Sequence, residues 1–248
     1  MRRLLALGLT LTAAGGGVAV AATAGHADKA TGGLSLSPAV LEQPAGPLAP
    51  LTVVNRSGST LDVTVAARPW IQASDGRTEP DRKHSLAGVT VAQPAFTLAP
   101  GQSQAVGVTV AAVPAAGALY GALDVIGLPT NAKQAKGVVL GYRLIGTLRL
   151  TPAVPVHKLT AALKARGRTI ELALTNHGNT VDPVSGGATI KDPRGTRSPA
   201  VDGVRILPSK TVRVRLAKRL RAGSYRVSAR LEQAGRTVAK VTKKVAVR

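Results

Sequence analysis

Apolar residues between positions 34 and 151 alternate with polar residues or form short runs. Glycine, proline or asparagine interrupts them about every eight to twelve residues. Period-two alternation is typical of strands that bury one face, and turn residues at this spacing are typical of antiparallel β-sandwiches. We therefore expect an all-β protein. The predicted strands are 34–40, 51–55, 61–67, 89–92, 105–111, 118–126 and 138–150.

The last of these segments, 138–150, has the clearest alternation. Its even positions are largely apolar, and Arg143, Thr147 and Arg149 stand among its odd positions. Because successive side chains of a strand point to opposite faces, one face of this long strand should be buried. The apolar even positions are Val138, Leu140, Tyr142, Leu144, Leu148 and Leu150.

The pattern restarts after a proline-containing connector at 151–155. Three landmarks then recur in the same order: 54–60 matches 175–180, 98–103 matches 206–211, and 116–120 matches 222–225. Ordered self-similarity of this kind indicates a tandem repeat of one structural unit. We predict two immunoglobulin-like antiparallel β-sandwich domains over 34–152 and 153–248.

The segment before the first domain has the pattern of an export signal. Arg2 and Arg3 precede an uncharged run over 4–24, and small residues follow at two places suited to cleavage, after Ala24 or Ala27. A basic start, an apolar run and small residues are typical of signal peptides. We predict a signal peptide over 1–27 and a short linker over 28–33; an uncleaved membrane anchor is the alternative. The mature protein should be extracytoplasmic and cell-wall associated, with no membrane span.

Positive charge is concentrated in the second predicted domain. The chain has 33 Lys and Arg against 12 Asp and Glu, a formal net charge of +21. Residues 155–248 hold 21 of the bases and five of the acids, whereas residues 34–154 hold nine bases and six acids. A strand over 212–216 would bury its apolar residues and present Arg213 and Arg215 on its outer face. The candidate polyanion-binding residues are Arg213, Arg215, Lys218, Arg219 and Arg221.

Outside the cytoplasm, such a surface would attract wall phosphate polymers, peptidoglycan carboxylates or anionic lipid headgroups. Nucleic acid is a poorer candidate because aromatic residues, which stack on bases, make up 2% of the chain. The alternative interpretation is that the arginines reflect compositional bias on solvated faces.

No catalytic or metal-binding pattern stands out. The absence of cysteine excludes disulfides and thiolate chemistry, and no histidine has another within five residues. The cations interspersed in the acidic loop 75–82 argue against a calcium site there. Trp70 should pack in the core or at an edge of a sandwich, the alternative being a platform for a sugar ring. We expect a non-catalytic protein without catalytic residues, metal or cofactor.

Several segments of the first domain resemble pilus-chaperone-type immunoglobulin-like domains. These segments are Leu34-Ser35-Leu36-Ser37-Pro38-Ala39-Val40, the Asn55 turn, Ala99-Pro100-Gly101-Gln102-Ser103, and residues 114–121. Among such domains, they look most similar to the peptidoglycan-binding domain of WxL-type surface proteins. Pilus chaperones carry a basic pair in the interdomain cleft, including an arginine on the first strand, and the segment 34–42 has no arginine.

These observations lead to two main functional hypotheses, and an enzyme that uses an unrecognised carboxylate pair is a third possibility. The first is an exported envelope protein that binds cell-wall or other anionic surface polymer, protein partners, or both through its immunoglobulin-like domains. The second is a pilus-chaperone-like assembly factor whose long 138–150 strand binds a client's strand by β-augmentation.

Overall fold

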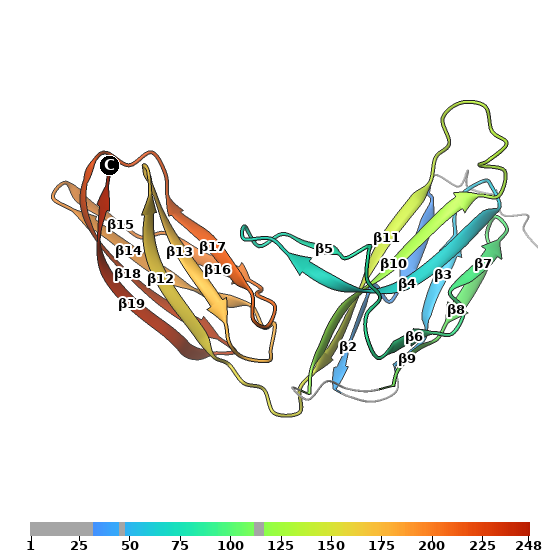
Figure 1. The fold of residues 1–248 in the computed structure, drawn as a ribbon, viewed down its shortest axis with the longest axis horizontal. Coiled ribbons are helices and arrows are strands. Elements are labelled where there is room, and N and C mark those ends of the chain that lie inside the picture. Colours follow the sequence, from blue (N-terminus) through green and yellow to red (C-terminus); the bar gives the residue numbers. More distant parts are fainter. Residues whose placement is uncertain (1–31, 45–47, 112–116) are drawn as a thin grey trace, which may run out of the picture.

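The computed structural model describes residues 32–44, 48–111 and 117–248, all of which form strands, turns and loops (Figure 1). The predicted signal peptide and its cleavage positions lie outside the described residues. Among the described residues, none belongs to a helix long and apolar enough to cross a membrane.

The first β-sandwich contains strands β1 to β11. Its smaller sheet has the order β1 (Leu34–Ser37), β3 (Leu51–Asn55), β8 (Ser103–Val106). The larger sheet has the order β2 (Val40–Pro44), β11 (Tyr142–Thr151), β10 (Leu119–Pro129), β4 (Leu61–Gln72), β5 (Thr78–Pro80), and β7 (Ala95–Leu98) also pairs with β4. A separate two-stranded ladder joins β6 (Val89–Val91) to β9 (Val108–Val110).

The second β-sandwich contains strands β12 to β19. One sheet has the order β12 (Leu159–Arg166), β13 (Thr169–Asn176), β17 (Thr211–Ala217). The other has the order β15 (Gly195–Arg197), β14 (Val184–Asp192), β18 (Gly223–Gln233), β19 (Arg236–Val247), and β16 (Ala200–Val204) also pairs with β14. Both sandwiches are therefore immunoglobulin-like, as the alternation predicts.

The two sandwiches repeat one topology. The ladder β1-β3-β8 corresponds to β12-β13-β17, and β4-β10-β11 corresponds to β14-β18-β19. Each sandwich also has a short hairpin strand: β5 pairs with β4 in the first, and β15 pairs with β14 in the second. The parallel strand β2, which pairs with β11, has no counterpart along β19 among the described residues.

The repeat extends to hydrogen bonds at a buried asparagine. In the first sandwich, the Asn55 Nδ2 donates to the carbonyls of Ser59 at 2.8 Å and Leu98 at 2.9 Å, while its Oδ1 accepts from the Ser57 N–H. The Asn176 Nδ2 donates to the carbonyls of Thr180 and Ile206, each at 2.7 Å, and its Oδ1 accepts from the Gly178 N–H. The predicted matches of 54–60 with 175–180 and of 98–103 with 206–211 are thus confirmed.

Each sandwich has its own core of aliphatic side chains. Leu51, Leu148 and Leu150 are fully buried in the first, and Ile170, Leu172 and Leu174 in the second. Alternation along β3 and β13 produces this arrangement, because every second residue of each strand is buried.

One landmark match differs from the prediction. Tyr225 lies two residues after Gly223 and is buried, with its hydroxyl donating to the Arg221 carbonyl at 2.9 Å. In the first sandwich, Leu119 lies two residues after Gly117 and is the buried residue. Leu119 therefore corresponds to Tyr225, and Tyr120 is shifted to the opposite face of β10.

Candidate functional site: the interdomain pocket and the β11 edge

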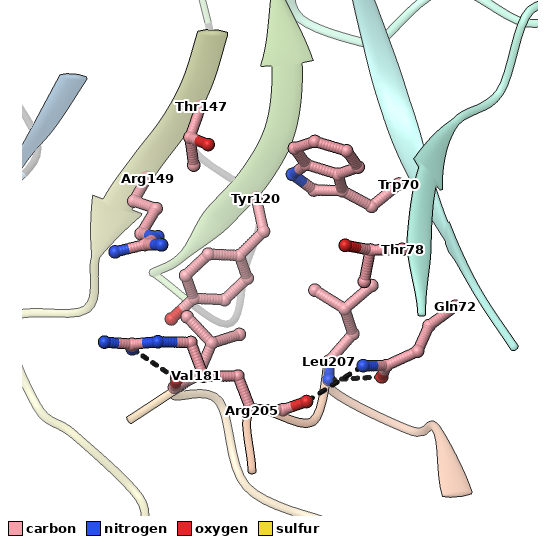
Figure 2. A pocket seen from close by; sticks show the side chains of 9 residues that line it. All are labelled: Trp70, Gln72, Thr78, Tyr120, Thr147, Arg149, Val181, Arg205 and Leu207. Carbon is pink, nitrogen blue, oxygen red and sulfur yellow. Dashed lines mark hydrogen bonds between the residues drawn. The ribbon is translucent and has the colours of Figure 1, made fainter. Parts of the chain in front are cut away.

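A pocket of about 140 Å³ lies between the two sandwiches (Figure 2). The first sandwich contributes residues from β4, β5, β10 and β11, and the second contributes residues from two loops. The lining residues are Trp70, Gln72, Thr78, Tyr120, Thr147, Arg149, Val181, Arg205 and Leu207.

The β4–β5 hairpin connects the first sandwich to the second. The strand β4 continues to Gln72, beyond the predicted end at 67. The Gln72 side-chain amide donates to the Arg205 carbonyl and accepts from the Leu207 N–H, both at 2.9 Å (Figure 2). At the hairpin tip, the Ser74 carbonyl accepts from the Arg213 N–H at 2.6 Å. These hydrogen bonds between the hairpin and the second sandwich fix one wall of the pocket.

Trp70 lies on this wall and outside both hydrophobic cores. Its indole faces the pocket from β4, across from Tyr120 on β10 (Figure 2). The expectation of core packing is therefore wrong for this residue; Trp70 lies instead near the edge of the sheet, where it pairs with Pro80 of the terminal strand β5. Trp70 is an even-numbered residue of β4, and the even positions are on the face opposite the buried Leu61, Val63 and Val65.

Tyr120 forms a further link between the sandwiches. Its hydroxyl donates to the Asn179 carbonyl at 2.7 Å. Burial, followed by the nearby Asp182 carboxylate, raises the pKa of Tyr120 to about 12. The phenol is consequently neutral near pH 7 and retains the proton that this hydrogen bond requires.

Two arginines place positive charge in the pocket. Arg149 comes from β11 and Arg205 from the second sandwich, and both guanidiniums lie on the side of the Tyr120 hydroxyl (Figure 2). Arg149 pairs with Glu42 at 2.9 Å, and Arg205 donates to the Val181 carbonyl at 2.9 Å. Because a guanidinium has five N–H donors, each arginine retains donors for a ligand. The cleft therefore contains a basic pair although the first strand has no arginine.

The outer edge of β11 is half covered. The parallel strand β2 pairs with residues 147–151, and the Thr147 N–H donates to the Ala39 carbonyl at 2.8 Å. Backbone groups alternate in direction along a strand, so the N–H groups of Arg143 and Ile145 point the same way as that of Thr147. No strand of the described part of the chain pairs with them there. Within the part of the chain that the structure describes, the edge over 142–146 is thus open to another strand.

Exposed apolar side chains lie on β11 and in the segment directly before it. Val138 is 97% exposed, Leu140 72% and Ile145 44%. The predicted strand start at 138 is wrong, because β11 begins at Tyr142, and the face that packs against the core runs from Tyr142 to Leu150. Residues 138–141 continue the apolar alternation without a strand partner.

A partly buried ion pair supports the open half of β11. The Arg143 guanidinium donates to both carboxylate oxygens of Asp124 on β10, at 2.6 and 2.9 Å, and Asp124 is 5% exposed. Hydrogen bonding to this carboxylate raises the pKa of Arg143. The pair ties β11 to β10 beside the edge that has no partner, so β11 offers a firm template there.

The predicted polyanion-binding residues fall into two places. Arg213 and Arg215 are exposed on β17, with Val212 and Leu216 buried and Val214 half-buried, as the alternation predicts apart from the partial exposure of Val214. Lys218, Arg219 and Arg221 are exposed in the turn between β17 and β18. None of the five lines the interdomain pocket. No cluster of metal-ligating side chains occurs among the residues that the structure describes.

The sequence analysis missed the interdomain pocket as a unit. Arg149, Trp70, Tyr120 and Arg205 are far apart in the sequence, and their convergence depends on how the hairpin meets the second sandwich. One signal pointed to the open edge: the exposed residues Val138 and Leu140 belong to the alternation from which the long strand was predicted.

No protein-family model matches the chain, and no curated protein matches it. Solved structures do match. A chain from the chaperone–tip adhesin complex of CFA/I fimbriae biogenesis has a TM-score of 0.55 at 13% identity, covering 86% of this chain and 99% of its own. The class 5 fimbriae chaperone CfaA has a TM-score of 0.51 at 14% identity, covering 86% and 98%. The YadV chaperone has a TM-score of 0.50 at 13% identity, covering 85% and 98%. The chain therefore has the two-sandwich fold found in fimbrial chaperones.

Proposed function

We propose that this protein is an exported, non-catalytic assembly factor of the pilus-chaperone type, which binds an extended segment of a client protein by β-augmentation along β11. The observation that carries the proposal is the open edge over 142–146, flanked by exposed apolar side chains. An unprotected apolar edge is a hazard in a protein that does not use it, because it pairs with other chains. A binding role explains why this edge is retained.

The chemistry of the edge fits an extended polypeptide. Main-chain groups of Arg143 and Ile145 supply hydrogen bonds that are independent of client sequence. Val138 and Leu140 add exposed apolar surface. Every second side chain of a client strand lies on the same face, so apolar residues at alternate client positions can contact this surface. A client segment with alternating apolar residues would therefore bind better than a polar one.

The interdomain pocket supplies a second contact. A client strand running parallel to β11 directs its carboxyl end toward Arg149, since β11 runs from the open edge to the pocket. Guanidiniums bind carboxylates through paired, charge-assisted hydrogen bonds. The Arg149 and Arg205 pair thus favours a client segment that ends in a free carboxylate.

The test uses a fluorescently labelled synthetic peptide with alternating valine and threonine, about ten residues long. Its affinity for the protein is measured by anisotropy. Val138→Asp/Leu140→Asp should weaken binding on the order of a hundredfold, because two exposed apolar contacts are lost. The matched control is Val154→Asp/Val156→Asp, which places the same charges at other exposed apolar positions, 75% and 45% exposed.

Unchanged binding by the 138/140 variant, or equal losses in both variants, would contradict the proposal. The other hypothesis, attachment to cell-wall polymer through Arg213, Arg215, Lys218, Arg219 and Arg221, stays a prediction.

A further inference from the structure

A second pocket, of about 470 Å³, lies at the surface of the second sandwich. It is formed by the β14–β15 hairpin on one side and by the turn between β17 and β18 on the other. Four arginines line it: Arg194 and Arg197 from the hairpin, and Arg219 and Arg221 from the turn. This pocket is separate from the interdomain pocket and has no part in the proposed client binding.

The charge of the pocket is strongly positive. Asp192 is the one carboxylate among its lining residues, and its Oδ1 accepts from the Arg194 backbone N–H at 2.9 Å. None of the four guanidiniums takes part in an ion pair with another described residue. Four unpaired cations facing one hollow repel one another, and an anion would relieve that repulsion.

Hydrogen bonds to Arg168 and Tyr225 hold the turn that carries two of these arginines. Leu220 is buried, and its N–H donates to the Arg168 carbonyl at 3.0 Å. The Leu220 carbonyl accepts from the Arg168 Nε at 2.7 Å. The buried Tyr225 donates to the Arg221 carbonyl. Arg219, directly before Leu220, has a φ of 55°, a left-handed conformation that is costly for a side-chain-bearing residue. The surrounding bonds therefore hold the backbone so that Arg219 and Arg221 both line the pocket.

We propose that this pocket binds a phosphate group. Arginine is suited to phosphate because its planar guanidinium donates paired hydrogen bonds to two oxygens, and several guanidiniums can share the oxygens of one phosphate. A phosphate carried by a small molecule and one in a phospholipid headgroup present the same chemistry here. The assignment differs from a uniform basic surface, since Arg213 and Arg215 on β17 do not line the pocket.

The first experiment titrates the full chain with inorganic phosphate and follows the backbone amide resonances of residues 219–221. Sodium chloride at matched ionic strength is the salt control. We compare Arg219→Gln/Arg221→Gln with Arg213→Gln/Arg215→Gln, which removes the same charge from the same sandwich. The pocket variant should bind phosphate at least about tenfold more weakly than wild type, and the β17 variant should bind it like wild type. Circular dichroism verifies that both variants fold.

The absence of saturable shifts in the wild-type chain, or equal weakening in both variants, would overturn the proposal. A second arm measures binding to phosphatidylglycerol vesicles, with phosphatidylcholine vesicles as the control. Vesicle binding lost in the pocket variant alone identifies a lipid headgroup as the source of the phosphate. Equal vesicle binding by the two variants, together with selective loss of inorganic phosphate, supports a small phosphate-bearing ligand.

Discussion

The last strands of the two sandwiches, β11 and β19, occupy the same position in the repeated topology. They differ in their exposed side chains, which are apolar beside β11 and include several lysines along β19. Beside β11, Val138, Leu140 and Ile145 are exposed. Along β19, the exposed side chains include Lys240, Lys243 and Lys244. Lysines on an edge strand prevent pairing with another chain, whereas an apolar edge invites it.

This difference distinguishes the features that serve folding from those that we assign to binding. The asparagine turn, the strand order and the buried aliphatic positions are shared by both sandwiches, so they serve folding. The apolar edge occurs on β11 and not on β19, and it lies on the sandwich whose β4–β5 hairpin reaches across to form the interdomain pocket (Figure 1). The features that distinguish the first sandwich from its repeat are therefore those that we assign to client binding.

The largest expected effect is on the free energy of unfolding, at the buried asparagine that both sandwiches share. Asn55→Ala or Asn176→Ala should each lower the free energy of unfolding of its own sandwich by about 3 kcal/mol, because buried carbonyl and N–H partners lose their hydrogen bonds. Denaturation followed by circular dichroism measures this effect, with Asn131→Ala at an exposed turn as the control. A large loss for one asparagine and none for the other would show that the two turns are not equivalent.

The edges can be made alike by substitution. Lys240→Val/Lys244→Val should give β19 exposed apolar side chains and shift the protein toward larger species in sedimentation velocity, since apolar surface on an edge strand favours pairing with another chain. Lys240→Gln/Lys244→Gln removes the same charge without adding apolar surface and should sediment like wild type. If the valine variant matches this control, exposed apolar side chains on β19 are not enough to make this strand pair with another chain.

A smaller effect is expected in the interdomain pocket. Wild type should bind a peptide with a free carboxylate about tenfold more tightly than the same peptide amidated at its end, and Arg149→Gln should abolish this preference. Lys133→Gln, an exposed change of equal charge, should retain it. Anisotropy with the two peptides provides the measurement, and a preference that survives in Arg149→Gln would remove Arg149 from the site.

The smallest effect concerns Tyr120. Its pKa of about 12 in the folded chain lies above the ordinary value of 10. The neutral phenol therefore favours the folded state fully below pH 10, and this contribution is lost as pH rises from 10 to about 12. In a titration of tyrosinate absorbance, Tyr120→Phe should remove the component that ionises near pH 12. A variant that loses a component near pH 10 instead would contradict the burial of this phenol.

Local patterns predicted most strands of the first sandwich, β17 of the second and the repeat, because alternation and turn residues are local consequences of burying one face of a sheet. The extension of β4 through Pro69 was missed, since proline normally interrupts strands and the pairing of Pro69 with Gly121 comes from β10. The start of β11 was placed four residues early, because apolar alternation does not reveal whether a partner strand is present. The pocket was missed because Arg149 and Arg205 converge through interdomain hydrogen bonds that no local pattern encodes.

Amide hydrogen exchange at Arg143 and Ile145 tests the central claim most directly. Their N–H groups point to the open edge of β11, so we expect rapid exchange in the free protein. The alternating peptide with a free carboxylate should slow exchange at both amides and leave the amides of β19 unchanged. Protection that appears on β19, or peptide binding without protection of Arg143 and Ile145, would contradict β-augmentation along β11.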